Sequence, residues 1–395
     1  MSRKNILQYA QRLTKIQPFH VMDILAQAKS LEGQGESIIH LEVGEPDFPT
    51  PTEIVNAGIL ALQENKTQYT AATGLTELKE AIALFYSTTY SKEINPDTIL
   101  ITPGASGALL LCLSILLDSG DKVLMTDPGY PCNKNIVTLL GASPVLVPLD
   151  ADTDFLPSVE DFNDAWDDNV KAILIASPAN PTGSVIPSDL LAELINFCEL
   201  KNIALIIDEI YLGLSYEDDN LVQTSANISK HCFVINSFSK YFCMTGWRLG
   251  WIIAPESAVK SLDKIAQNIF LAAPSIAQHA ALHAFDEKVI QQLEIRREEF
   301  RQRRDYLYPA LESLGFIINK KPQGAFYLYA ECSNLTEDSF HLSNELLYKA
   351  GVAVTPGIDF GHHKSNTHVR FAYTRNLAQL QQAIQRMQLY FSANG

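Results

Sequence analysis

Short apolar runs alternate with longer segments of helical periodicity through the middle of the chain. The apolar runs predict β-strands at residues 98–102, 122–126, 172–176, 203–207, 232–236 and 250–254. Several runs are apolar throughout, which is typical of parallel strands buried on both faces. The segments between them, such as 108–117 and 187–200, have the apolar spacing of helices. The alternation predicts an α/β fold with a large domain, whose mostly parallel sheet is covered by helices on both faces.

The pattern changes near residue 285. A long, charge-rich helix is predicted at about 286–314, and its arginines alternate with glutamates, as on a solvated helix that links two domains. Short strands at 325–329, 352–355 and 368–373 then predict a smaller α+β domain. We expect a large domain at 45–290. The small domain would consist of 1–44 and 291–395, with an N-terminal segment that packs against it and has no sheet of its own.

Composition limits the partners and the compartment. The 395 residues include 30 Lys+Arg and 45 Asp+Glu, a net charge of −15 that argues against nucleic acid as a partner. No apolar run is long enough to span a bilayer, and the N-terminus lacks the pattern of a signal peptide. The six cysteines form no C-x-x-C pair, and no H-E-x-x-H metal motif is present. We therefore expect a soluble cytoplasmic protein with no metal and no membrane partner.

Polar residues follow four of the predicted strands, where ligands of parallel sheets bind. The turn 103–107 would place Ser106 and backbone N–H groups at a helix start, which suits a phosphate or serves only as a helix cap. Asp208 follows an apolar strand. Its carboxylate would either pair with a cation or serve as another helix cap. Lys240 and Asn180, each in a loop, are unremarkable alone. Together the four strand ends supply the anion cradle, carboxylate, carboxamide and lysine that pyridoxal phosphate requires.

The sequence resembles, over almost its whole length, the fold-type I pyridoxal-phosphate-dependent aminotransferases of class I/II, the aspartate aminotransferase superfamily. The resemblance rests on Tyr69 and on motifs at 43–48, 180–183, 208–211, 237–240, 244–248, 324–327, 356–357 and 369–370. It implies the aspartate aminotransferase-like fold and pyridoxal 5'-phosphate as the cofactor. It also implies a transaminase that moves an amino group from an L-amino acid to a 2-oxo acid by a ping-pong mechanism.

The resemblance also implies roles for individual residues. Lys240 would form the Schiff base and move the substrate proton, Asp208 would pair with the ring nitrogen, and Tyr211 would bond the ring oxygen. The residues implied to bind the cofactor are Ala105, Ser106, Tyr130, Asn180, Asp208, Tyr211, Ser237, Ser239, Lys240 and Arg248. Tyr69 would reach the phosphate of the partner subunit, so a homodimer with shared active sites is expected. Those implied to bind the substrate's carboxylate are Gly44, Asn180 and Arg370.

Two positions bear on the substrate. Relatives that take dicarboxylic substrates carry either a lysine after the Gly pair of the phosphate turn, where this chain has Ser106, or an arginine in the region that here spans 268–274, where none is present. The side-chain pocket is expected to be largely apolar, lined by residues 16–19, Tyr130 and Phe360. A neutral or aromatic amino donor is therefore favoured over aspartate.

Two other functions remain open. A pyridoxal-phosphate-dependent carbon–sulfur β-lyase shares the fold and most of these motifs, although no separate general acid for elimination is evident. A non-catalytic effector-binding module of aminotransferase-like sequence is the other alternative. It would need a DNA-binding segment, and the residues before Val43 show neither a helix-turn-helix nor a basic patch. The amino donor, the acceptor and the pathway are not determined by the sequence.

Overall fold

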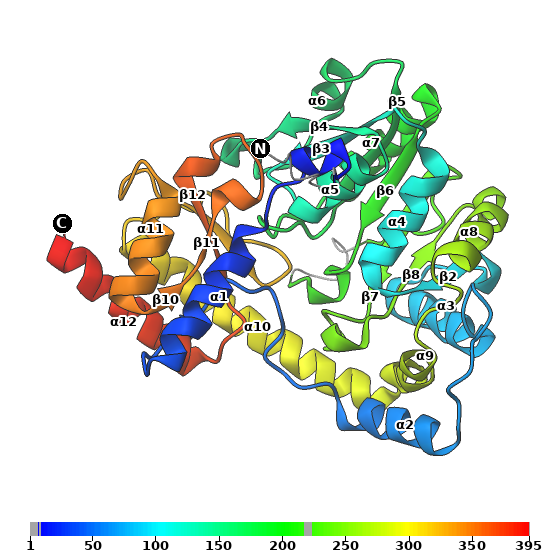
Figure 1. Cartoon of the computed structure of the whole chain (residues 1–395), viewed down its shortest axis with the longest axis horizontal. Coiled ribbons are helices and arrows are strands. Elements are labelled where there is room, and N and C mark those ends of the chain that lie inside the picture. The colour runs from blue at the N-terminus through cyan, green and yellow to red at the C-terminus, as the bar shows by residue number, and fades with distance from the viewer. Residues whose placement is uncertain (1–6, 8, 217–222, 395) are drawn as a thin grey trace, which may run out of the picture.

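The computed structural model describes residues 7, 9–216 and 223–394. Within these ranges one large sheet has the strand order β2-β8-β7-β6-β5-β3-β4 (Figure 1). β8 runs antiparallel to both of its neighbours, and the other adjacent pairs are parallel. The strands are β2 (Ile99–Thr102), β3 (Lys122–Asp127), β4 (Ser143–Pro148), β5 (Val170–Ala176), β6 (Ala204–Asp208), β7 (Cys232–Ser237) and β8 (Gly250–Ile253). The predicted α/β fold with a mostly parallel sheet is confirmed.

Strand β4 has no counterpart in the hydrophobic pattern. It is an edge strand that pairs only with β3, and most of its residues are exposed or half-buried. An edge strand needs no continuous apolar run, so it lacks the signal that marks its neighbours. The reversed direction of β8 also has a local reason. Only residues 238–249 separate it from β7, and they form no crossover helix of the kind that a parallel connection requires.

Alternate residues of each strand face two different helical layers. Strand residues such as Leu100, Met125 and Ile206 pack with α4 (Gly104–Leu116), α5 (Pro131–Leu139) and α8 (Glu256–Ile269). Their neighbours Ile101 and Leu124 join the larger core on the opposite face. The helices of that core include α2 (Thr52–Gln63), α3 (Thr76–Tyr90), α6 (Val159–Asp164), α7 (Ser188–Lys201) and α9 (Ser275–Ala281). The two-residue period of the strands therefore explains why helices cover both faces.

Helix α10 (Glu287–Ser313) runs from the side of the large sheet to a second, smaller sheet (Figure 1). The smaller sheet is antiparallel, in the order β11-β12-β9. Its strands are β9 (Tyr327–Glu331), β11 (Thr355–Pro356) and β12 (His368–Ala372), packed with α11 (Ser339–Glu345), the π-helix η7 (Leu346–Ala350) and α12 (Leu377–Asn394). The boundaries expected between the two domains, at residues 44/45 and 290/291, remain a prediction.

The N-terminal segment differs from its prediction in one respect. It forms α1 (His20–Gly33) and also a short strand, β1 (Ile39–His40), which pairs in parallel with β10 (Val352–Ala353). A two-residue strand leaves no periodic signal in a sequence, so this pairing could not be predicted. Helix α1 packs through Ile24 and Ala28 on the same part of the molecule. No helix in the described ranges is both long and apolar enough to cross a membrane.

Candidate active site

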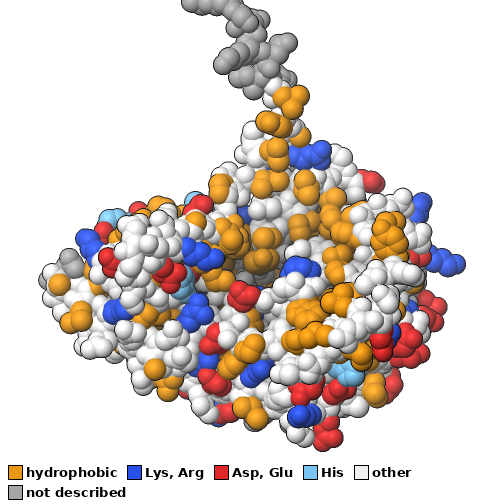
Figure 2. All heavy atoms as spheres, turned by 60° about the horizontal axis from the view of Figure 1, so that its bottom comes forward, with side chains coloured by type: hydrophobic (Ala, Val, Ile, Leu, Met, Phe, Trp, Pro, Cys, Tyr) orange, Lys and Arg blue, Asp and Glu red, His pale blue; other side chains and the backbone are white. Residues whose placement is uncertain are grey.

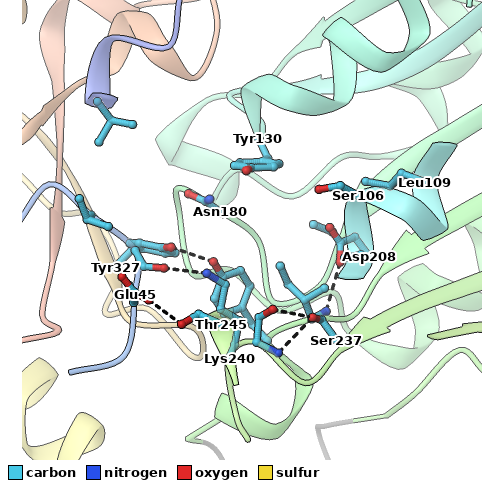
Figure 3. Close-up of a pocket in the computed structure, with 18 of the residues that line it drawn as sticks. Glu45, Ser106, Leu109, Tyr130, Asn180, Asp208, Ser237, Lys240, Thr245 and Tyr327 are labelled. Carbon is cyan, nitrogen blue, oxygen red and sulfur yellow. Dashed lines mark hydrogen bonds between the residues drawn. The ribbon is translucent and has the colours of Figure 1, made fainter. Parts of the chain in front are cut away.

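A cavity of about 310 Å³ lies where the parallel strands end, between the large sheet and the small one. The residues predicted to bind the cofactor or the substrate's carboxylate all line this cavity, except Tyr69. Those residues are Gly44, Ala105, Ser106, Tyr130, Asn180, Asp208, Tyr211, Ser237, Ser239, Lys240, Arg248 and Arg370. Tyr69 lies outside the cavity with 80% of its surface exposed. In Figure 3, Tyr130 lies across the cavity from Lys240, and Asp208 and Tyr327 lie on opposite sides.

Lys240 extends into the cavity from the loop that follows β7. Its Nζ donates a hydrogen bond to the carbonyl oxygen of Gly44, at 2.7 Å. Burial, together with the positive charge of Arg370, lowers the pKa of Lys240 to about 8. A lysine with such a pKa has a substantial neutral fraction near pH 7, so it can act as a nucleophile or as a general base.

Asp208 is the last residue of β6, and only 4% of its surface is exposed. Burial raises the pKa of Asp208 to about 7, and a hydrogen bond from the backbone N–H of Ile210, at 3.2 Å, partly opposes this effect. Among the described residues, no lysine or arginine lies at ion-pair distance from its carboxylate. A protonated nitrogen placed beside it would therefore hold the carboxylate ionised and offset its burial.

An anion cradle forms around the start of α4. Gly104 has a φ of +72°, and a Cβ at this position would lie 2.7 Å from Nη2 of Arg248. Glycine therefore permits both the backbone turn and the close approach of the guanidinium group. The Oγ atoms of Ser237 and Ser239 lie 3.0 Å apart on the neighbouring loop. Hydroxyl groups, an arginine and the N–H groups of a helix start together suit a phosphate.

Arg370 lies on β12, at the opposite side of the cavity from this cradle, and is 3% exposed. It donates from Nη1 to Oδ1 of Asn180 at 2.8 Å and from Nη2 to the carbonyl oxygen of Glu42 at 2.6 Å. Its buried Nε has no hydrogen-bond partner among the described residues. The guanidinium carbon lies 4.3 Å from the centre of the Tyr327 ring and 4.7 Å from the centre of the Phe360 ring. A rigid guanidinium group with a free donor is suited to a carboxylate.

Three polar residues of the cavity have contacts that the sequence did not reveal. Tyr327 and Tyr211 are joined through their hydroxyl groups at 2.7 Å. Glu45 accepts a hydrogen bond from Oγ1 of Thr245 at 2.5 Å (Figure 3). Tyr327, Glu45 and Thr245 all lie in motifs that carry the family resemblance, and this was the signal that could have found them.

The apolar wall of the cavity was predicted only in part. Phe19 and Tyr130 line it as expected, but residues 16–18 do not. Phe360 does not line it either, and its ring packs against the guanidinium group of Arg370 instead. The apolar residues that line it without having been predicted are Val21, Met22, Val43, Leu109, Ala176 and Ile210. Val21 and Met22 take the place of residues 16–18 because α1 begins at His20 and its first turn faces the cavity.

The comparisons with known proteins agree with this geometry. The family model described as aminotransferase class I and II matches residues 36–387. The chain is 40% identical to the (5-formylfuran-3-yl)methyl phosphate transaminase of Methanocaldococcus jannaschii, over 97% of this chain and 99% of that protein. It is 34% identical to the valine–pyruvate aminotransferase of Mycobacterium tuberculosis, over 94% and 96%. A crystal structure of an aminotransferase from M. tuberculosis superposes with a TM-score of 0.93 at 34% identity, covering 98% of this chain and 100% of that one.

Proposed function

Because this chain belongs to the class I and II aminotransferases, we propose that it binds pyridoxal 5'-phosphate and transfers an amino group from a neutral or aromatic L-amino acid to a 2-oxo acid. The observation that carries the proposal is that Lys240, Asp208 and Arg370 meet in one cavity. Members of the family generally depend on this cofactor. The amino and 2-oxo acids that act as substrates would each bind through a carboxylate.

The residues present fit the cofactor. Asp208 is a buried carboxylate that lacks a cation, the surroundings of Gly104 and Arg248 form an anion cradle, and Lys240 is an amine with a lowered pKa. A pyridine nitrogen, a phosphate and an aldehyde would complement these three features. When bound, the cofactor would supply the aldehyde for amine exchange and a ring that accepts electrons from the substrate's Cα.

The protein's own groups then have distinct tasks. Lys240 would hold the cofactor covalently and, once displaced by substrate, take up the proton at Cα. Asp208 would keep the ring nitrogen protonated. Tyr211, whose hydroxyl is held at 2.7 Å by that of Tyr327, would bond the ring oxygen. Ser106, Ser237, Ser239, Arg248 and the N–H of Ala105 would hold the phosphate, while Tyr130 would stack on the ring.

The substrate preference follows from the cations of the cavity. Among the described lining residues these are Lys240, Arg248 and Arg370, and the three are assigned to the cofactor, its phosphate and the α-carboxylate. No further cation of this chain is left there for a second substrate carboxylate. Phe19, Val21, Met22 and Leu109 present apolar surface instead. A neutral or aromatic side chain would therefore bind better than that of aspartate.

We also infer a homodimer. Tyr69 is 80% exposed, and the hydroxyl of its neighbour Thr70 accepts a hydrogen bond from Gln278 at 3.0 Å. Hydrophobic side chains of α2 are exposed as well: Ile59, Leu60 and Leu62. On the face drawn in Figure 2, hydrophobic side chains gather in groups. A second copy that covers such surface and receives Tyr69 at its phosphate site would complete each active site. The six free cysteines fit a cytoplasmic location.

The test is a panel of amino acids and 2-oxo acids offered to the purified enzyme with pyridoxal phosphate. We expect alanine, leucine or phenylalanine to react faster than aspartate, and parallel lines in double-reciprocal plots, as ping-pong kinetics require. Lys240→Ala should abolish turnover and change the absorbance of the bound cofactor, whereas Lys349→Ala, a control at an exposed lysine, should change neither.

Faster reaction of aspartate than of the neutral amino acids would refute the substrate preference. Pyruvate and ammonia formed from cystathionine without an oxo acid would indicate a β-lyase, and a Lys240→Ala protein with full function would indicate a binding module.

A further inference from the structure

One loop of the small domain contacts three parts of the candidate active site. Residues 357–364, which we call the docking loop, lie between β11 and β12. The docking loop touches the end of β3, the first turn of α1 and the guanidinium group of Arg370. None of its residues lines the cavity itself. Any influence of the docking loop on the substrate is therefore indirect.

The carboxylate of Asp127 anchors this loop to the large sheet. Asp127 is the last residue of β3 and is 4% exposed. Its Oδ2 accepts hydrogen bonds from the backbone N–H groups of His362, at 2.9 Å, and of His363, at 3.2 Å. The N–H of Gly129 donates to the carbonyl oxygen of Phe360 at 2.8 Å. A buried carboxylate that accepts backbone N–H groups makes strong, charge-assisted bonds.

The docking loop approaches this carboxylate closely at Gly361. A Cβ built on Gly361 would lie 1.6 Å from Oδ1 of Asp127, well inside van der Waals contact. The φ angle of Gly361 is not in the left-handed region, so its backbone alone would accept alanine. Gly361 is therefore required for the close approach of Asp127 and not for its own conformation.

The other side of the loop faces the groups that surround the substrate. Phe360 is 3% exposed, and its ring lies 4.7 Å from the guanidinium carbon of Arg370. Asp359 accepts hydrogen bonds from the N–H groups of His20, at 2.9 Å, and of Val21, at 2.8 Å. These N–H groups begin α1, whose first turn lines the cavity. Displacement of the docking loop would release one face of Arg370 and the start of α1 together.

We propose that Asp127 is a positioning residue for substrate binding: by anchoring the docking loop, it holds Phe360 against Arg370 and the first turn of α1 over the cavity. The ligand affected is the α-carboxylate of the amino or 2-oxo acid, so this inference rests on the proposed function. Within the described part of the chain, the docking loop forms no hydrogen bond or ring contact with Lys240 or Asp208. The loss of Asp127 should therefore weaken binding of the carboxylate more than it slows the chemical step.

The first test is Asp127→Ala in the holoenzyme. We expect KM for the preferred amino acid to rise about tenfold while kcat changes less than about twofold. Calorimetric titration with 3-phenylpropionate, a carboxylate that has no amino group and cannot react, should show the same loss of affinity. Asp127→Asn keeps one acceptor oxygen and should lose less affinity than Asp127→Ala. Asp150→Asn is the matched control, because Asp150 binds His363 and Lys364 of the same loop from a half-exposed position. It should leave KM within about twofold.

The second test depends on the close approach of Gly361. Gly361→Ala should weaken 3-phenylpropionate binding in the wild-type background, because its Cβ displaces the loop from Asp127. In the Asp127→Ala background the same change should add little, because the clashing carboxylate is gone. Equal effects of Gly361→Ala in both backgrounds, or wild-type affinity in folded Asp127→Ala, would refute the proposal. Failure of the wild-type enzyme to transaminate any amino acid would refute the proposed function instead.

Discussion

Burial brings the pKa values of the two central charged residues towards each other. Asp208, raised to about 7, and Lys240, lowered to about 8, both lose hydration at the bottom of the same cavity. Neither shift requires a direct ion pair, since the first cause in each case is desolvation. Both residues therefore titrate close to neutral pH in the cofactor-free protein, and the burial of their charges costs stability there.

The free-energy cost of burying the charge of Asp208 predicts the effect of Asp208→Asn on the cofactor-free protein. Since folding raises the pKa of Asp208 from 3.8 to about 7, the stability that protonated Asp208 contributes is fully present below about pH 3.8 and is lost as the pH rises to about 7. Asparagine carries no such charge. At pH 8 the free energy of unfolding of Asp208→Asn should exceed that of the wild type, by up to about 4 kcal/mol. Urea titrations of both proteins at pH 5 and pH 8 would measure the two free energies of unfolding. An equal difference between the variant and the wild type at both pH values would contradict the prediction.

At the scale of elements, the segment after β1 links the small sheet to the active site. Its backbone carbonyls accept hydrogen bonds from three sides: Leu41 from Ala372 at 2.7 Å, Glu42 from Arg370 at 2.6 Å, and Gly44 from Lys240 at 2.7 Å. The side chain of Glu42 is fully buried, and its Oε2 has no hydrogen-bond partner in the described ranges. Its other oxygen meets Nδ1 of His40 at 2.7 Å. When protonated, His40 therefore compensates this buried carboxylate.

The pair predicts a pH-dependent stability. The hydrogen bond to Glu42 is the main cause that raises the pKa of His40 above 6.5, and Glu32 contributes from α1. Stability from the pair is thus fully present below pH 6.5 and is lost as the pH rises through the folded-state pKa. His40→Gln should lower the free energy of unfolding by about 1 kcal/mol at pH 6 and by less at pH 9. Thermal unfolding at the two pH values would test this, with Glu42→Gln expected to remove the same pH dependence.

At the scale of the whole molecule, the proposed dimer divides each active site between two chains. Lys240, Asp208 and Arg370 lie in one chain's cavity, while exposed Tyr69 would serve the partner's. This division allows a test by mixing subunits. A Lys240→Ala homodimer would be inactive, and a Tyr69→Ala homodimer would bind the cofactor poorly. A hybrid of the two would retain one site with both Lys240 and Tyr69.

Unfolding and refolding the two variants together should therefore restore about a quarter of the wild-type activity, because half of the dimers are hybrids with one intact site each. The mixed sample should exceed the sum of the separately refolded variants. Turnover per enzyme chain, with dimer content checked by analytical ultracentrifugation, provides the measurement. A mixture no more active than that sum would show that Tyr69 does not serve the partner subunit.

The sequence by itself determined the fold class, the enzyme family and most of the residues that meet in the cavity. Apolar strands buried on both faces carry a strong local pattern, and the residues after them, such as Asp208 and Lys240, meet because parallel strands end at one edge. Only the tertiary structure revealed β4, β1, the first turn of α1 as the cavity wall, and the anchoring of the docking loop by Asp127. These depend on an edge strand, a two-residue pairing and contacts between residues more than 200 positions apart, none of which leaves a periodic signal.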